Sequence, residues 1–423
     1  MLARLHRPRG AVPPAPRFRS IVPVVALLAL ALLALALTSC AEQARQAGQD
    51  VVEKQEQGSF FTVPTPLPPG QPGSIIRSER LYGAPTGARA WRVLYRSTDL
   101  RGRPIAVSGI VVAPNGPGPT GGRPVVAWAH PTTGAKGRCA PSRGLDPFVL
   151  MEGLHELLAS GYVVAATDYS GMGADGPASY LIGSTEGRNV LDAARAAAAL
   201  NDAHAGADLL LWGHSQGGQA ALFAAQLAPT YAPEFDVHGV AVAAPAAQLA
   251  DLLNLDIGDV SGVTIGAYAL DAFQRVYAAD HPGLKLTSVL TPAGAAAVPT
   301  MAPLCLLSQK KELHRIATPL IGKFLVANPA KLEPWSTFLA ENTPGGTPIN
   351  VPILVVQGSS DSLVKPATTK ALVARLCAQG ETVQARFYDH TTHATIPYRA
   401  LPLVLTWLDA RLADKPAKST CPR

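Results

Sequence analysis

The chain has 423 residues, of which 48% are hydrophobic, and it contains 38 glycines and 38 prolines. This length is enough for one large α/β domain with an insertion or for two domains, and the apolar content excludes a mainly disordered chain. The formal charge of +6 comes mostly from five arginines before residue 40, and the remainder has 31 bases against 30 acids. This balance does not indicate a nucleic-acid partner.

The first 39 residues have the layout of an export signal. The five arginines precede an apolar run over residues 21–37, which at about 17 residues is marginal for a transmembrane span. The run ends in Leu-Thr-Ser-Cys, which resembles the lipobox of bacterial lipoproteins. The resemblance implies a signal peptide over residues 1–39 and acylation of Cys40, which would anchor the protein to the outer face of a bacterial membrane. An ordinary signal peptide with an incidental cysteine, and hence a secreted protein, is the alternative.

Residues 40–74 are predicted to be a polar tether followed by a proline-rich extended segment. Beyond them, short apolar runs bounded by turn residues alternate with helical patterns. The predicted strands are Trp91–Arg96, Ile105–Ala113, Val125–Ala129, Tyr162–Thr167, Leu209–Trp212, Val237–Ala243, Ile353–Gln357 and Val383–Tyr388. The predicted helices are Phe148–Ser160, Glu186–Asn201, Gln216–Ala228, Pro366–Cys377 and Pro402–Leu412. This alternation predicts an α/β fold with a mostly parallel, doubly wound sheet.

Residues 245–349 interrupt the alternation. They contain helix-like runs and many prolines but no obvious strand, and a structureless loop of about a hundred residues is improbable in a compact domain. We therefore predict a helical cap, or lid, inserted over the carboxyl edge of the sheet between core segments 75–244 and 350–423. A lateral helical domain with no role at a site is the alternative.

The apolar run Leu209–Trp212 leads into Gly213-His214-Ser215-Gln216-Gly217, and an Ala/Leu-rich helical pattern follows at once. A G-x-S-x-G sequence between a buried strand and a helix is typical of a nucleophile elbow, a tight turn that exposes a serine hydroxyl at the end of a parallel sheet. A side chain at either glycine would hit the neighbouring strand or helix. Because so short a pattern also arises by chance, the prediction that Ser215 is a nucleophile depends on its partners.

A nucleophilic serine needs a base and an acid that orients the base, and chains with this elbow carry them in the order serine, acid, histidine. Asp361 directly follows a predicted strand, at the sheet end where ligands bind, and is preferred to Asp389 and Asp409. The base is His393 or His390, and His393 is preferred because it leads toward the last helix. The H-x-x-H pair lacks a third ligand nearby and does not indicate a metal site. An aspartate that only caps the following helix is the alternative for Asp361.

The developing oxyanion needs backbone N–H donors. One is the N–H of Gln216, the residue after the serine. The other is expected in the loop after the strand that ends at Ala129, where Thr132 and Thr133 are both candidates because Pro131 has no N–H. His214 is expected to point away from the nucleophile and to serve as a packing or hydrogen-bonding residue.

Four cysteines follow Cys40 in the sequence, namely Cys139, Cys305, Cys377 and Cys421. An even number in an exported protein favours two disulfides, and four cysteines permit three pairings. No C-x-x-C or other metal-ligand spacing is present, so the sequence predicts no zinc site.

These motifs together resemble the secretory lipase family of α/β hydrolases, which includes yeast-type lipase A enzymes and exported bacterial lipases and esterases. The resemblance covers nearly the whole mature chain. The matching stretches are Phe60-Phe61-x-x-Pro64, Pro69–Gly73, His130–Gly134, Cys139–Ser142, Asp168-Tyr169-x-Gly171-x-Gly173, Gly213–Gly218, Gly358-x-x-Asp361-x-x-Val364 and His393.

The resemblance implies an α/β-hydrolase fold with a helical lid, and hydrolysis of a small-molecule ester or lipid by Ser215, Asp361 and His393 without a cofactor or metal. It also implies that Cys139 pairs with Cys305 and Cys377 with Cys421. Two alternatives remain for the function. One is a serine peptidase or amidase on the same fold, and the other is an inactive envelope lipoprotein that binds a lipid or a partner.

Overall fold

The structure is a computed structural model and describes residues 60–422. The predicted signal peptide, Cys40 and most of the predicted tether lie outside the described residues. Among the helices of the described range, none has the length and hydrophobicity that a membrane span requires.

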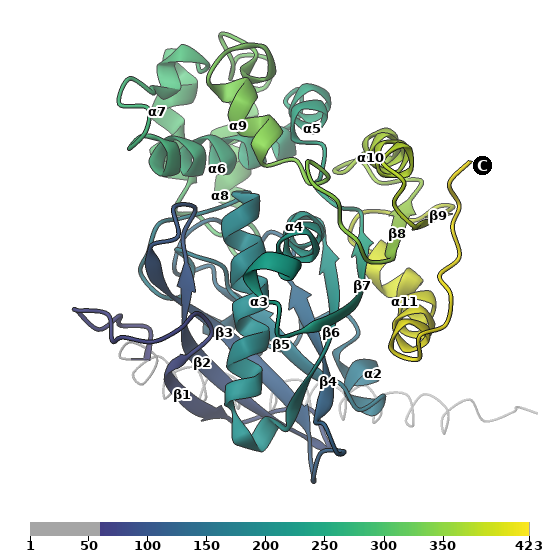
Figure 1. The fold of residues 1–423 in the computed structure, drawn as a ribbon. Helices are drawn as coiled ribbons and strands as arrows, with labels where there is room; N and C mark the ends of the chain where they lie inside the picture. Colours follow the sequence, from purple (N-terminus) through teal and green to yellow (C-terminus); the bar gives the residue numbers. More distant parts are fainter. Residues whose placement is uncertain (1–59, 423) are drawn as a thin grey trace, which may run out of the picture. The chain divides into compact units, whose positions relative to one another are not determined.

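Nine strands form one sheet in the order β1-β2-β3-β5-β4-β6-β7-β8-β9 (Figure 1). Neighbours from β1 to β5 pair antiparallel, and all neighbours from β5 to β9 pair parallel. The predicted mostly parallel α/β sheet is therefore confirmed. The strands are β1 (Ile75–Leu81), β2 (Ala88–Thr98), β3 (Pro104–Pro114), β4 (Arg123–Ala129), β5 (Val163–Thr167), β6 (Ala205–His214), β7 (Asp236–Ala243), β8 (Ile353–Gly358) and β9 (Val383–Tyr388).

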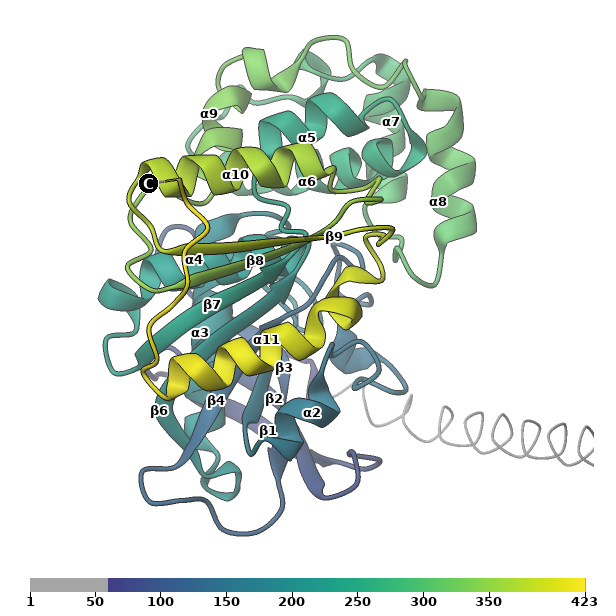
Figure 2. The same ribbon diagram turned by 90° about the vertical axis from the view of Figure 1, so that its right-hand side faces the viewer.

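Helices cover both faces of the sheet (Figures 1 and 2). The strand period of two places Leu209 and Leu211 of β6 on one face, and Leu210 and Trp212 on the other. Because both faces are buried, the central strands are apolar throughout. The first face packs against α3 (Gly183–Ala199), α4 (Gln216–Tyr231) and α10 (Pro366–Ala378), and the second against α2 (Leu154–Ala159) and α11 (Ile396–Leu412).

The largest differences from the sequence prediction concern β1, α2 and α11. Strand β1 was not predicted, because its polar residues pair only with β2 at the edge of the sheet. Helix α2 begins at Leu154 rather than Phe148, after Gly153 in the left-handed conformation. Helix α11 begins at Ile396 and continues through Pro402, because Ile396, Ala400 and Val404 bury one continuous helical stripe that outweighs the lost hydrogen bond.

Residues 245–349, all of which the structure describes, are largely helical. Their aromatic side chains form an apolar cluster of their own, which includes Tyr268, Phe273, Phe324, Trp335 and Phe338. The helices gather beyond one end of the sheet (Figure 2). They are α5 (Leu249–Asp256), α6 (Val260–Tyr277), α7 (Pro292–Met301), α8 (Lys310–Ala317) and α9 (Trp335–Glu341).

Two disulfides join segments that are distant in the sequence. Cys139 is bonded to Cys305, which connects the loop after β4 to the segment between α7 and α8. Cys377 is bonded to Cys421, which connects α10 to the C-terminal tail. These are the pairs that the family resemblance implies.

Replacing both cysteines of the Cys139–Cys305 bond with serine is expected to lower the melting temperature more than replacing both cysteines of Cys377–Cys421. The bonds join residues 166 and 44 positions apart, and cross-links that close longer loops remove more entropy from the unfolded chain, about 5 against about 4 kcal/mol here. Thermal unfolding followed by circular dichroism measures both losses. An equal or larger loss in the second double variant would contradict the expectation.

Candidate active site

Ser215 occupies the turn between the last residue of β6 and the first residue of α4. Its backbone has φ 58° and ψ −119°. Residues other than glycine rarely adopt this combination, which stores strain. The surrounding packing holds this conformation, since Ser215 is only 7% exposed. The turn therefore presents the serine at the carboxyl end of the central strand.

Two glycines make this turn possible. A Cβ atom at Gly217 would lie 1.8 Å from the carbonyl oxygen of Ala129 in β4, and one at Gly213 would lie 2.1 Å from the carbonyl oxygen of Gly217. Neither distance is compatible with a side chain. The start of α4 therefore lies directly against the backbone of β4 and fixes the height of Ser215 above the sheet.

Asp361 and His393 form a hydrogen-bonded pair. Asp361 follows β8, His393 lies between β9 and α11, and the His393 Nδ1 is 2.8 Å from the Asp361 Oδ2. The other carboxylate oxygen of Asp361 accepts the backbone N–H groups of Leu363 and Val364 at 2.9 and 2.8 Å. These bonds hold the carboxylate in place, so Asp361 both orders its own loop and orients the His393 ring.

Burial lowers the pKa of His393 from its ordinary value of 6.5, while the bond to Asp361 raises it and the neighbouring His214 lowers it. The net effect is a depressed pKa, so His393 is neutral near pH 7 and able to accept a proton. His390, the other predicted candidate, is exposed, and its backbone N–H donates to the Ser359 hydroxyl. The structure therefore pairs Asp361 with His393 and not with His390.

Ser215 and His393 line one cavity of about 320 Å³. Most of its wall is apolar and comes from α5, α6 and α9, with side chains such as Leu249, Leu253, Ile265, Phe273, Trp335 and Leu339. Apart from Asp256 of α5, its charged and polar side chains come from outside residues 245–349. A cavity of this kind excludes water from the polar groups and accommodates hydrocarbon.

The two candidate oxyanion threonines have different surroundings. Thr132 lines the cavity, and its hydroxyl is 2.8 Å from the hydroxyl of Tyr180. Thr133 is buried, with its hydroxyl donating to the carbonyl of Cys139 and its own carbonyl accepting the N–H of Leu306. The position of Thr132 in the cavity wall therefore favours it over Thr133.

Gln216, the other donor candidate, is buried against an acid that the sequence did not indicate. Its side-chain amide donates to Glu186 at 2.7 Å, and the backbone N–H of Leu181 donates to the same carboxyl oxygen at 3.0 Å. Glu186 lies in α3 and is fully buried, and this burial raises its pKa to about 8. The carboxyl group therefore supports the first turn of α4 in its neutral form at pH 7.

The expected orientation of His214 is wrong. Instead of pointing away from the nucleophile, His214 lines the same cavity as Ser215 and packs its ring against that of His393. It is also 2.9 Å from the carboxylate of Glu152, a residue that sequence reasoning missed. Only the fold brings them together, because Glu152 and His214 lie 62 positions apart.

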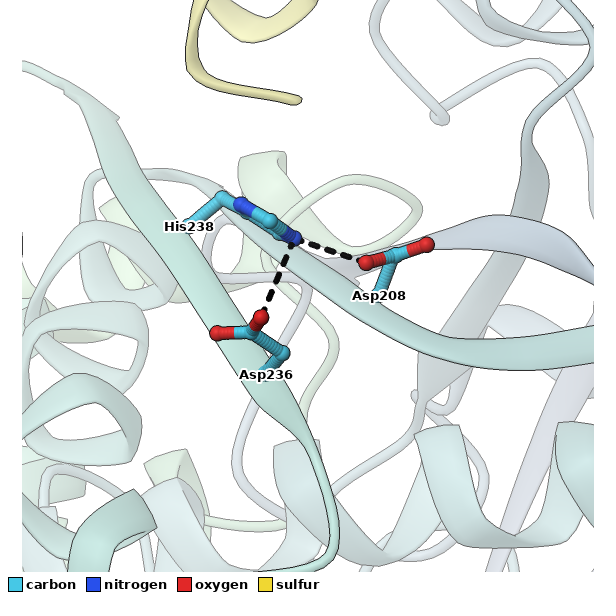
Figure 3. A group of neighbouring side chains, drawn as sticks. All are labelled: Asp208, Asp236 and His238. Atoms are coloured by element: carbon cyan, nitrogen blue, oxygen red, sulfur yellow. Dashed lines mark hydrogen bonds and ion pairs between the residues drawn. The ribbon is translucent and has the colours of Figure 1, made fainter. Parts of the chain in front are cut away.

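Among the described residues, one group of three side chains has ligand atoms close enough together to hold a metal ion. The group consists of Asp208, Asp236 and His238 (Figure 3). The Nε2 of His238 is 2.8 Å from Asp208 and 3.9 Å from Asp236. Asp208 and His238 lie near the starts of β6 and β7, whereas Ser215 follows the end of β6. This group is therefore not part of the cavity, and its two aspartates share the Nε2 of His238 as a neighbour.

A mostly parallel sheet, a strained serine between β6 and α4, and an Asp–His pair on the loops after β8 and β9 define an α/β hydrolase. The model of the secretory lipase family matches residues 149–420. The chain belongs to this family, as its motifs predict.

Among curated relatives, lipase 6 of Candida albicans is 26% identical over 406 residues, which cover 86% of this chain and 83% of that protein. A probable inactive lipase of Mycobacterium tuberculosis is 27% identical over 380 residues, covering 84% and 82%. Among solved structures, Candida antarctica lipase A in its closed state has a TM-score of 0.71 at 18% identity, covering 86% and 87%. A rice cell wall degrading esterase from Xanthomonas oryzae has a TM-score of 0.65 at 21% identity, covering 82% and 100%. At these identities the structures support the fold alone.

Replacing Glu186 with glutamine is expected to change how stability depends on pH. The folded pKa of about 8 lies above the ordinary 4.5, so the contribution of Glu186 is full below pH 4.5 and is lost as pH rises toward 8. The free energy of unfolding of the wild type, relative to Glu186→Gln, should therefore fall by up to about 1.4 kcal/mol per pH unit between pH 5 and 8. Denaturant unfolding of both proteins at the two pH values measures this difference. The same difference in free energy of unfolding between the two proteins at both pH values would contradict the expectation.

Proposed function

We propose that the protein is an exported serine carboxylic-ester hydrolase, a lipase or esterase, that acts through an acyl-enzyme on Ser215. The observation that carries the proposal is the Asp361–His393 bond of 2.8 Å beside the strained Ser215, with Ser215 and His393 in one apolar cavity. Membership of the secretory lipase family supports the same reaction class.

In the proposed reaction, the Ser215 hydroxyl oxygen attacks the ester carbonyl carbon while its proton passes to the Nε2 of His393. Asp361 accepts the Nδ1–H of His393, which fixes the tautomer and stabilises the imidazolium. Collapse of the tetrahedral intermediate breaks the bond to the alcohol, which takes the proton from His393. A water molecule then attacks the acyl carbon while His393 takes its proton, the bond to the Ser215 oxygen breaks, and Ser215 takes the proton back from His393 as the acid is released.

The oxyanion of the tetrahedral intermediate receives the backbone N–H of Gln216 and, in this proposal, that of Thr132. Gln216 is the first residue of α4, so its N–H belongs to the unpaired donors at the positive end of the helix dipole. Each such donor contributes roughly 10²–10³ in rate. The Glu186 contact keeps the Gln216 side chain out of the way of this donor.

The apolar wall of the cavity supports an acyl chain or another hydrocarbon group as the part of the substrate that it encloses. Burial of each CH₂ group there contributes about 0.8 kcal/mol. Residues 245–349 provide this wall through α5, α6 and α9, which supports their role as a cap over Ser215. A peptide substrate would bring several polar groups that this wall leaves without partners.

For the location, we propose that the chain is exported, cleaved before Cys40 and anchored by lipid to the outer face of the membrane. The basic region, the apolar run and the Leu-Thr-Ser-Cys ending support this arrangement, and so does membership of a secretory family. Secretion without an anchor is the outcome if Cys40 is not acylated.

A second candidate is a catalytically inactive protein that binds lipid or a partner at the cell envelope. The relative from Mycobacterium tuberculosis, described as a probable inactive lipase, favours it. The hydrogen-bonded Asp361–His393 pair supports the active enzyme instead, because a binding protein has no need of a base oriented in this way.

Ser215→Ala and His393→Ala are expected to reduce kcat on p-nitrophenyl esters by at least about 10⁴-fold, because either change removes a group that makes or breaks a bond. His390→Ala is the matched control, since it removes an exposed histidine three residues away, and it should keep kcat within about twofold. Circular dichroism verifies that all three variants are folded.

Assays of the wild-type protein on an ester and on the matching anilide distinguish an esterase from an amidase. Turnover of the ester alone supports the proposal. A folded Ser215→Ala variant with turnover within tenfold of the wild type would overturn it, and a wild type without any ester turnover would favour the inactive candidate.

A further inference from the structure

A buried carboxylate–imidazole pair lies directly beside the proposed catalytic groups. Glu152 precedes α2, and His214 is the last residue of β6. The two residues are each 4% exposed, and their side chains are joined at 2.9 Å through the Glu152 Oε1 and the His214 Nδ1. Both line the cavity that contains Ser215 and His393.

Two tryptophans hold Glu152 in this position. The indole N–H of Trp128 donates to the second carboxylate oxygen at 2.9 Å, and that of Trp212 donates to the main-chain carbonyl of Glu152 at 3.0 Å. Trp128 and Trp212 are direct partners across the parallel strands β4 and β6. Both carboxylate oxygens of Glu152 therefore have a hydrogen-bond partner, Trp128 on one and the Nδ1 of His214 on the other.

The His214 ring packs against the His393 ring, with centroids 4.7 Å apart and planes inclined by 39°. The contact between the two rings therefore joins two acid–histidine pairs, Asp361–His393 and Glu152–His214. The Nε2 of His214 is buried and has no hydrogen-bond partner. Burying an acid and an imidazole here costs desolvation energy that packing alone would not require, since apolar residues would fill the space.

We propose that Glu152 and His214 are positioning residues for ester hydrolysis: His214 supports the ring of His393, and the Glu152 carboxylate stabilises the imidazolium that forms on His393. This inference rests on the proposed function. When the Ser215 proton reaches His393, a positive charge develops one ring away from Glu152. The Glu152 carboxylate raises the pKa of His393, so its charge acts on His393 across the His214 ring.

Of the other titratable groups near this pair, Asp256 also lines the cavity and is paired with the Lys365 ammonium at 2.8 Å. Burial lowers the pKa of His130 and raises the pKa values of Tyr169 and Tyr398, so all three are neutral near pH 7. The Asp361 carboxylate, bonded to His393, and the Glu152 carboxylate both raise the pKa of His393 against the lowering by burial, and removing either charge should lower that pKa further.

The test compares wild type with Glu152→Gln and His214→Asn, in kcat and KM on p-nitrophenyl butyrate between pH 4.5 and 9. Glu156→Gln is the matched control, because Glu156 is an exposed glutamate four residues from Glu152. Glu152→Gln should lower kcat about tenfold, leave KM within about twofold, and move the acid limb of kcat/KM about one unit to lower pH. Glu156→Gln should match the wild type in all three.

His214→Asn keeps an amide donor for Glu152 but removes the ring from His393. It should lower kcat about tenfold without moving the acid limb to lower pH, because the Glu152 charge remains and the lowering effect of His214 on the pKa of His393 is removed. If Glu152→Gln does not fold, the kcat of His214→Asn tests the inference in its place. A folded Glu152→Gln protein with unchanged kcat and acid limb, or a His214→Asn protein with unchanged kcat, would overturn the inference. Loss of activity in Ser215→Ala alongside such a result would leave the proposed function intact, whereas full activity in Ser215→Ala would overturn both.

Discussion

The contact between the start of α4 and the backbone of β4 determines the geometry on which the rest of the site depends. Gly217 lies so close to the carbonyl of Ala129 that a Cβ atom does not fit, and this closeness forces Ser215 into its strained conformation. Because β4 and β6 are parallel neighbours in the centre of the sheet, the serine is fixed relative to the loop after β4 that carries Thr132. The loops after β8 and β9 then supply Asp361 and His393 at the same edge.

The cavity combines two kinds of surface with different origins. The core supplies most of the polar groups, among them the hydrogen-bonded His393 and His214, and residues 245–349 supply most of the apolar wall. In such a dry environment each charge acts more strongly on its neighbours than it would in water. We therefore expect the Asp361–His393 and Glu152–His214 pairs to interact more strongly beside this apolar wall than they would in water.

The sequence predicted the strand–turn–helix around Ser215, the alternation of the core and the helical character of residues 245–349, since each depends on local periodicity or on glycine. It missed what depends on contacts between distant segments. Glu152 lies in a turn just before α2 and belongs to no motif, and Glu186 looks like an ordinary residue of an amphipathic helix. The start of α11 was placed too late because Pro402 suggested a boundary, although the buried stripe continues across it. The family resemblance, rather than the residues alone, gave the disulfide pairing.

The central claim is that Ser215 is an activated nucleophile. Labelling of the folded protein with a fluorophosphonate probe, followed by mass spectrometry of the peptides, tests this claim directly, because such probes form a covalent bond with a serine only where a base and oxyanion donors activate it. The account predicts one adduct, on Ser215, which is absent when His393 is replaced by alanine. No adduct on a folded protein, or an adduct on another serine, would contradict it.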